Sequence, residues 1–227
     1  MGSNIRKKRR VSVKRKAAMK RRIFRLCIAA VLIVLIIIAV RAFRAREISD
    51  YIASTASFTR RGEVEVTTIE TFGKSYYDQD ELRQAIRDAV DQYNQDNGGG
   101  KELIEWKGLT VRGGVATLIL DYKSVGDYVS FNSAPMFFGT VKDAIEQGYD
   151  LRGILSAASR RNTSKILTQR DFEELSSNRL IYVTEKMNLV VPRRILYASG
   201  NLKVSADRQA IVNGTISESS PAILILE

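Results

Sequence analysis

The stretch Leu26–Val40, LCIAAVLIVLIIIAV, decides how this chain is organised. It spans fifteen residues and contains no charge, amide or proline. Fifteen helical residues cover about 22 Å, whereas the hydrocarbon core of a bilayer is about 30 Å thick. Extending the run to Ile23–Phe43 gives 21 residues, or about 31 Å of helix. Arg25 and Arg41 lie near its ends, where their long side chains reach the headgroups. The sequence therefore predicts a transmembrane signal-anchor helix at 23–43.

The charges that flank this run predict its orientation. Residues 1–46 hold 15 Lys and Arg and no Asp or Glu. The more positive flank of a membrane helix stays in the cytoplasm, so we expect 1–22 to be a cytoplasmic arm and the C-terminal part to lie outside. Cations near an anionic inner leaflet gain about 1 kcal/mol each. Twelve of them precede the run, and we expect them at the membrane surface: Arg6, Lys7, Lys8, Arg9, Arg10, Lys14, Arg15, Lys16, Lys20, Arg21, Arg22 and Arg25.

Two other interpretations apply to this N-terminal part. A cleaved signal peptide has a shorter basic region and small residues at the cleavage site, which Val40-Arg41-Ala42 matches poorly. The basic clusters also resemble a nucleic-acid-binding tail. However, the net charge of +11 belongs to this arm, because residues 47–227 carry 21 positive and 25 negative side chains. We therefore expect a lipid bilayer, and no nucleic acid, as the partner of the arm.

The cysteine and histidine content excludes several kinds of chemistry. The chain has no histidine and a single cysteine, Cys27, which lies inside the apolar run. Ser-His-Asp and Cys-His catalysis and the usual zinc sites are therefore excluded. The sequence predicts no cofactor, no metal site and no catalytic residue. If the protein is an enzyme after all, the alternative that remains is an envelope-modifying enzyme that acts through carboxylates without histidine.

The first half of the remaining chain contains local signals for a helix and a hairpin. Residues 44–61 are expected to continue the membrane helix and then become a linker, with an extracytoplasmic domain at 62–227. A strand is expected from Val64. Asp78 is the expected N-cap of a helix that ends at Gly98, with Glu81 completing a capping box. An apolar stripe along this helix consists of Leu82, Ala85, Ile86, Ala89, Val90 and Tyr93. Two strands, Leu103–Val111 and Val115–Tyr122, are expected to pair across a glycine turn.

The second half is predicted to be rich in strands. Ser124, Thr140 and Thr168 are each placed to cap a short helix. The polar stretch 159–178 is the expected subdomain boundary or mobile loop. Six strands are expected after it: Leu180–Thr184, Asn188–Val191, Arg194–Ala198, Leu202–Val204, Gln209–Val212 and Ala222–Leu226. The fold class is α+β, with a mostly antiparallel sheet, one packed amphipathic helix and a β-rich C-terminal half.

Several separated blocks of sequence resemble one family of proteins. They are TTIETFGKSYYDQDEL (67–82), VGDYVSFN (125–132), FFGTVKDAIEQGYD (137–150) and VPRRILYASGNL (191–202). They resemble uncharacterised extracytoplasmic proteins of clostridial-type Gram-positive bacteria, many of them predicted lipoproteins. The resemblance covers residues 62–227 and implies a location in the cell envelope. It implies no activity and no site residues. This chain differs in having a signal-anchor helix in place of a lipidated cysteine.

Aromatic side chains are the candidate ligand-binding residues. If they lined one groove, they would stack on the sugar rings of an envelope polymer; otherwise they fill the core. The candidates are Tyr76, Tyr77, Tyr122, Tyr128 and Phe131, with Phe137 and Phe138 nearby in sequence. Asp78, Asp80 and Glu81 are explained by helix capping and the helix dipole. The expected function is therefore that of a non-enzymatic membrane-anchored module, which binds an envelope polymer or a partner protein or serves structurally.

Overall fold

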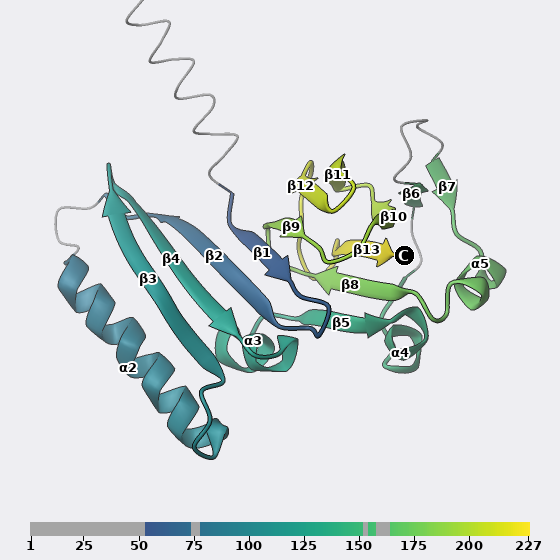
Figure 1. The fold of residues 1–227 in the computed structure, drawn as a ribbon. Helices are drawn as coiled ribbons and strands as arrows, with labels where there is room; N and C mark the ends of the chain where they lie inside the picture. Colours follow the sequence, from purple (N-terminus) through teal and green to yellow (C-terminus); the bar gives the residue numbers. More distant parts are fainter. Residues whose placement is uncertain (1–52, 74–77, 152–153, 158–163) are drawn as a thin grey trace, which may run out of the picture. The chain divides into compact units, whose positions relative to one another are not determined.

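The computed structural model describes residues 53–73, 78–151, 154–157 and 164–227 (Figure 1). The predicted arm 1–22, the predicted span 23–43, residues 44–52 and the tyrosines at 76 and 77 lie outside these described residues. Among the helices that are described, none is both long enough and apolar enough to cross a bilayer. Residues Ala53–Glu227 form a compact unit of their own, and all that follows concerns this unit.

The described elements confirm the α+β class. The helices are α2 (Gln79–Gly98), α3 (Val125–Asn132), α4 (Val141–Glu146) and α5 (Gln169–Glu174). The strands of the first half are β1 (Thr55–Phe58), β2 (Val64–Thr71), β3 (Ile104–Arg112), β4 (Val115–Tyr122), β5 (Met136–Thr140) and β6 (Ile154–Ala157). The remaining strands are β7 (Ser164–Ile166), β8 (Arg179–Val183), β9 (Asn188–Val190), β10 (Ile195–Ser199), β11 (Leu202–Ala206), β12 (Gln209–Val212) and β13 (Ala222–Leu226).

The strands form two sheets where the sequence analysis expects one. The first sheet has seven strands in the order β11-β12-β9-β1-β2-β4-β3, and the second has six in the order β5-β8-β13-β10-β6-β7. All described neighbours pair antiparallel except β1 and β9, which are parallel. Helix α2 packs along β3, while α3 contacts β4 and β5 (Figure 1).

The helix and hairpin predicted in the first half are confirmed, although the cap of α2 consists of the Asp78 bonds without the reciprocal Glu81 bond of a capping box. The Asp78 carboxylate accepts hydrogen bonds from the N–H groups of Asp80 and Glu81, and the helix stops at Gly99 with a φ of 54°. The strands β3 and β4 pair up to Arg112 and Val115. Gly113 and Gly114, between them, have φ values of 58° and 77°. A two-residue turn with φ positive at both positions matches the right-handed twist of the strands.

The short helices and the C-terminal strands are also confirmed, within one or two residues. Ser124, Thr140 and Thr168 cap α3, α4 and α5. Thr140 with Asp143 and Thr168 with Asp171 form complete capping boxes. The strands β5, β6 and β7 are additions that the sequence analysis does not predict. Each has three to five residues.

The start of the folded unit corrects the expectation for 44–61. Residues expected to form a fraying helix and linker contain β1, which lies between β2 and β9 inside the first sheet. Ala56 is fully buried and Phe58 is only 6% exposed. The segment TASF looks like a linker because it is small and partly polar, but pairing on both sides supplies the hydrogen bonds that its backbone needs. The folded unit therefore includes residues that precede Gly62.

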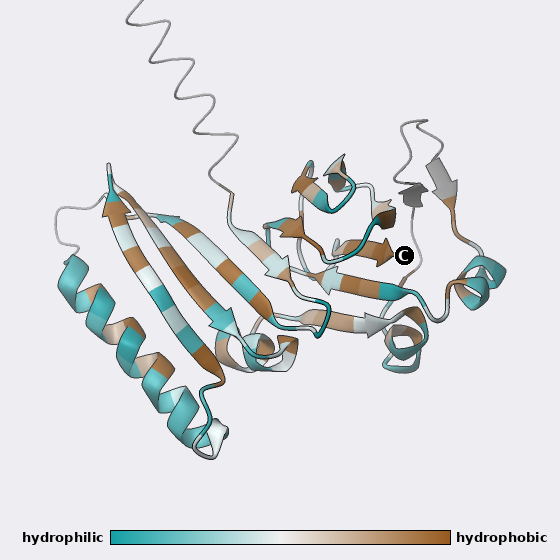
Figure 2. Ribbon diagram, in the orientation of Figure 1, coloured by the Kyte–Doolittle hydropathy of each residue, from teal (hydrophilic) through white to brown (hydrophobic). Residues whose placement is uncertain are grey.

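Two apolar cores hold the unit together. The main core joins the inner faces of the two sheets with Val90 of α2 and Tyr128 of α3. The second core lies under α4 and α5, on the other face of the second sheet. Strand β13 lies between the two cores, so Leu224 faces the first core and Ile225 faces the second. Burial on both faces explains why AILIL is apolar throughout, whereas β3 alternates between polar and apolar residues (Figure 2).

Candidate functional site

The predicted aromatic candidates lie in the core wherever the structure describes them. Tyr122 and Tyr128 are each 2% exposed, and their rings meet edge to face with centroids 5.2 Å apart. Phe131 packs edge to face on Tyr93, at 5.6 Å. Tyr122 and Tyr128 thus belong to the core and Phe131 packs against it, as the alternative interpretation of these residues expects.

The two buried tyrosines keep their hydroxyl groups hydrogen-bonded. The hydroxyl of Tyr122 accepts a hydrogen bond from Nδ2 of Asn132, at 3.1 Å. The hydroxyl of Tyr128 donates to the Glu185 carboxylate. Burial raises the pKa of Tyr122 to about 12 and also raises the pKa of Tyr128. Both groups therefore stay neutral at physiological pH and serve the core.

The carboxylates at the start of α2 have structural roles, as the sequence analysis expects. Asp78 caps the helix, and hydrogen bonds from the backbone N–H groups of Glu81 and Asp80 lower its pKa. Asp80 pairs with Arg83, with 2.5 Å between Oδ1 and Nη1. These groups are exposed and already engaged, so they do not form an acid–base pair.

A concave site in the described part of the unit is an apolar groove between α2 and the first sheet. We call it the α2 groove, and its volume is about 470 Å³. Its floor follows the register of the sheet, because Thr68, Leu118 and Leu109 are direct neighbours across β2, β4 and β3. Its wall is one face of α2, with Leu82, Ala85 and Ile86 at spacings of three and four residues.

The α2 groove exists because the first half of α2 is not fully packed on the sheet. Deeper along the helix Val90 is 3% exposed and belongs to the main core. Leu82 and Ile86 are only half-buried, and Ala85 is exposed. Apolar side chains that line a groove without filling it gain free energy when another apolar group covers them. The groove is thus suited to binding an apolar group.

The rim of the α2 groove is acidic. Glu70, Asp78 and Glu81 line it, and the described lining contains no Lys or Arg. All three carboxylates are exposed. An apolar group that carries positive charge is attracted to these described carboxylates.

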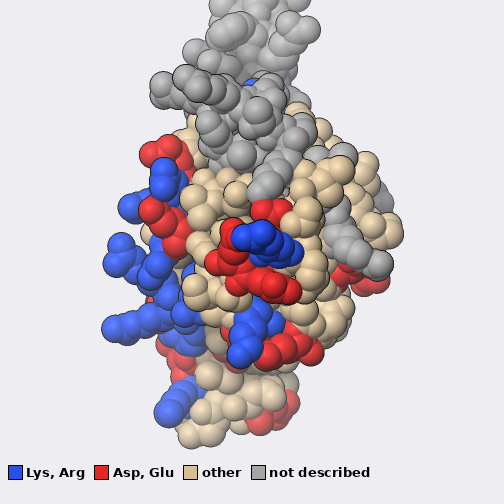
Figure 3. Space-filling view, turned by 90° about the vertical axis from the view of Figure 1, so that its right-hand side faces the viewer, with Lys and Arg blue, Asp and Glu red and all other residues tan. Residues whose placement is uncertain are grey.

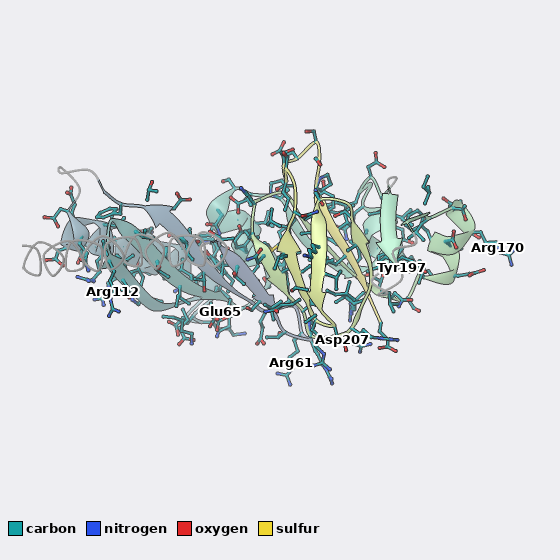
Figure 4. The ribbon with its side chains drawn as sticks, turned by 90° about the horizontal axis from the view of Figure 1, so that it is seen from above. Arg61, Glu65, Arg112, Arg170, Tyr197 and Asp207 are labelled. Atoms are coloured by element: carbon teal, nitrogen blue, oxygen red, sulfur yellow. The ribbon has the colours of Figure 1, made fainter. Side chains whose placement is uncertain are left out.

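Three further carboxylates form a row on the opposite face of the first sheet. Glu65, Asp121 and Glu105 are neighbours across β2, β4 and β3, and Glu65 is labelled in Figure 4. Two lysines pair with two of them: Lys107 lies 2.6 Å from Glu105, and Lys123 lies 3.4 Å from Asp121 and 3.5 Å from Glu105. The hydrogen bond from Lys107 lowers the pKa of Glu105.

This carboxylate row does not support the alternative of an enzyme. Glycosidases that use two carboxyl groups need one of them held protonated by a raised pKa. In the row, Glu105 has a lowered pKa, and both Glu105 and its neighbour Asp121 are ion-paired with lysines. The described residues also contain no group of three or more Asp, Glu or Cys that is placed to hold a metal ion.

The sequence analysis missed the α2 groove, although a signal for it was present. The apolar stripe of α2 runs from Leu82 to Tyr93 and begins at the first turn of the helix. Only Val90 of that stripe is buried. The identity of the floor residues depends on strand register, which the sequence does not give.

No protein family, curated protein or solved structure matches this chain.

Proposed function

We propose that this chain is a single-pass membrane protein of the cell envelope, with its N-terminus in the cytoplasm and the unit 53–227 outside. The apolar run Leu26–Val40 and the twelve cations that precede it support this topology. The charge difference along the chain supports it too, since residues 47–227 have more acidic than basic side chains.

The unit 53–227 is proposed to be a non-enzymatic binding module, and the α2 groove is its binding site. The observation that carries this proposal is the combination of an apolar lining with charged residues that, among those the structure describes there, are all acidic. Apolar contact provides affinity, whereas charge at the rim of an interface provides orientation and speed of association.

The occupant proposed for the α2 groove is a segment of a partner protein that carries apolar side chains flanked by Lys or Arg. Amphipathic segments bind apolar grooves in this way, with side chains on one face serving as anchors. The apolar side chains would cover Leu82, Ile86 and Leu118. The basic side chains would pair with Glu70 and Glu81 at the rim.

The test is a titration of the fragment 53–227 with a Leu/Lys peptide of about three helical turns, followed by fluorescence anisotropy. Replacing Leu118 with Ala removes a floor contact and is expected to weaken binding about tenfold. The double substitution Glu70→Gln and Glu81→Gln is expected to weaken it about fivefold, and only at low salt, because exposed ion pairs contribute less than about 1 kcal/mol each.

Two controls make this test specific. Asp91→Asn changes a charge on α2 outside the groove and is expected to leave binding unchanged. A Leu/Glu peptide of the same pattern is expected not to bind, because its charges are repelled by the rim. Equal binding of both peptides, or an unchanged affinity for Leu118→Ala, would show that the α2 groove is not the binding site.

The topology has its own test. A tag placed after Gly2 is expected to be protected from external protease in intact cells, and a tag after Glu227 is expected to be cleaved. The reverse pattern would overturn the proposed orientation without affecting the peptide titration.

A further inference from the structure

A second pocket is lined mainly by arginines, whereas the α2 groove is apolar with acidic residues at its rim. Arg60, Arg193, Arg194 and Arg208 surround a pocket of about 270 Å³ together with Pro192 and Glu227. We call these four residues the arginine cluster. They come from the turn between β1 and β2, the turn before β10 and the turn between β11 and β12. Basic side chains also gather at the left-hand edge of the face shown in Figure 3.

Backbone hydrogen bonds fix the turns that carry the arginine cluster. The N–H of Val191 donates to the carbonyl of Arg208 at 2.9 Å, and the N–H of Ile195 donates to the carbonyl of Asp207 at 2.8 Å. The turn that carries Arg60 is closed by a hydrogen bond from Thr59 N–H to the Glu63 carbonyl, at 2.9 Å. Fixed turns hold the backbone positions of these arginines around one pocket before any ligand arrives, which reduces the entropy lost on binding.

The charges in the pocket are unbalanced. Four arginines and one acidic residue, Glu227, line the pocket, and that residue is engaged: its carboxylate accepts from Nε and Nη2 of Arg194 at 3.1 Å, and its carbonyl accepts from Nη1 of Arg193 at 3.1 Å. The same pairing raises the pKa of Arg194. Arg60 and Arg208 form no ion pair with any residue that the structure describes. This excess of positive charge occurs in a part of the chain that is acidic in total.

We propose that the arginine cluster binds a phosphate-bearing anion. A guanidinium group presents its N–H donors in a planar fork that matches two phosphate oxygens. Arg60, Arg193 and Arg208 converge on one pocket, so a single phosphate group accepts hydrogen bonds from more than one of them. The remainder of the ligand extends into solvent, because the pocket is small and its arginines are exposed. The source of the phosphate is a lipid headgroup or a soluble phosphate compound, and the experiment separates the two.

The experiment measures the chemical modification rate of each arginine separately. Phosphate bound by the basic arm of the full chain therefore does not mask the result. The full-length chain in phosphatidylcholine nanodiscs is treated with phenylglyoxal, which modifies arginine, with and without inorganic tripolyphosphate. Mass spectrometry of the peptides then gives a rate for each residue. Tripolyphosphate is expected to slow modification of Arg60, Arg193 and Arg208 about fivefold or more, because bound phosphate occupies their N–H groups.

Arg112 and Arg170 are the internal controls. Figure 4 places them on either side of Arg61 and Asp207, the sequence neighbours of Arg60 and Arg208, and well away from both. Their modification rates are expected to stay unchanged. The variant Arg208→Gln is expected to reduce the protection of Arg60 and Arg193, whereas Arg112→Gln is not. Equal protection of all exposed arginines, or protection of none in the cluster, would overturn the proposal.

A second arm identifies the source of the phosphate. Nanodiscs that contain phosphatidylglycerol, without tripolyphosphate, protect the arginine cluster if it contacts the headgroups of its own membrane. Protection by tripolyphosphate alone assigns the site to a soluble or polymeric phosphate. If neither tripolyphosphate nor phosphatidylglycerol protects the cluster, the site does not bind phosphate. This outcome does not affect the proposal for the α2 groove, which the peptide titration tests.

Discussion

At Gly139 the absence of a side chain leaves room for the ring of Phe137, which lies two residues earlier on the same strand, β5. A Cβ atom at this position would lie 3.0 Å and 3.1 Å from the two Cε atoms of Phe137 and closer still to its Cζ. The ring has little room to move, because it packs on Tyr149 with centroids 4.8 Å apart. Gly139→Ala is therefore expected to lower the free energy of unfolding by about 2 kcal/mol, as overpacking in a core does.

Gly108 is the matched control for that substitution. It also lies in a strand, but a Cβ atom there would meet nothing within 4 Å. Gly108→Ala is expected to be neutral or slightly stabilising, because alanine restricts the unfolded chain. Urea unfolding of both variants measures the difference. If the two variants have the same stability, the contact between Gly139 and Phe137 does not constrain the core.

The raised pKa of Tyr122 predicts how the stability of the unit changes at alkaline pH. Its pKa is raised from 10.0 to about 12 by burial. Between these values the unfolded chain loses the tyrosine proton and the folded chain keeps it, so stability falls as pH rises, by about 1.4 kcal/mol per pH unit for this group. Below pH 10 the group contributes no pH dependence.

The variant Tyr122→Phe tests this assignment. Phenylalanine does not ionise, so the decrease in melting temperature between pH 9.5 and 11.5 is expected to be smaller than in the parent chain. Buried Tyr128, whose pKa is also raised, leaves part of the decrease in place. An unchanged pH dependence would show that Tyr122 is not shielded from solvent in the folded state.

At the scale of elements, β1 decides whether the first sheet is continuous. It pairs with β2 on one side and with β9 on the other, so removing it separates β9, β12 and β11 from the rest of the sheet. The fragment 53–227 is therefore expected to unfold cooperatively. The fragment 62–227, which begins where the sequence alone places the domain, is expected not to. Circular dichroism during heating distinguishes them, and a similar cooperative transition in both fragments would contradict the role assigned to β1.

The elements that could be predicted from sequence are those whose signals are local. The cap at Asp78 and the glycine turn at 113–114 each depend on neighbours within a few residues, and both are confirmed. β1 depends on partners far along the chain, since Thr55 pairs with Asn188. Register between distant strands leaves little trace in composition. The division of the strands into two sheets could not be predicted for the same reason.

At the scale of the whole molecule, both proposed sites depend on contacts between distant segments. The α2 groove needs β2, α2, β3 and β4 together, and the arginine cluster needs three separate turns and Glu227. From the sequence, the aromatics were the candidates for binding, but they are the residues a core requires, and the structure buries Tyr122 and Tyr128. The residues left available for binding are those that packing leaves partly exposed.

The central claim is that the unit binds a cationic, apolar-faced segment in the α2 groove. The most direct measurement is the change in backbone amide NMR shifts of 53–227 when the Leu/Lys peptide is added. The largest shifts are expected at Leu82, Ala85, Ile86, Leu109 and Leu118, with none on addition of the Leu/Glu peptide. Shifts centred on the opposite face of the sheet, at Thr67 and Ile119, or spread evenly over the unit, would contradict the claim.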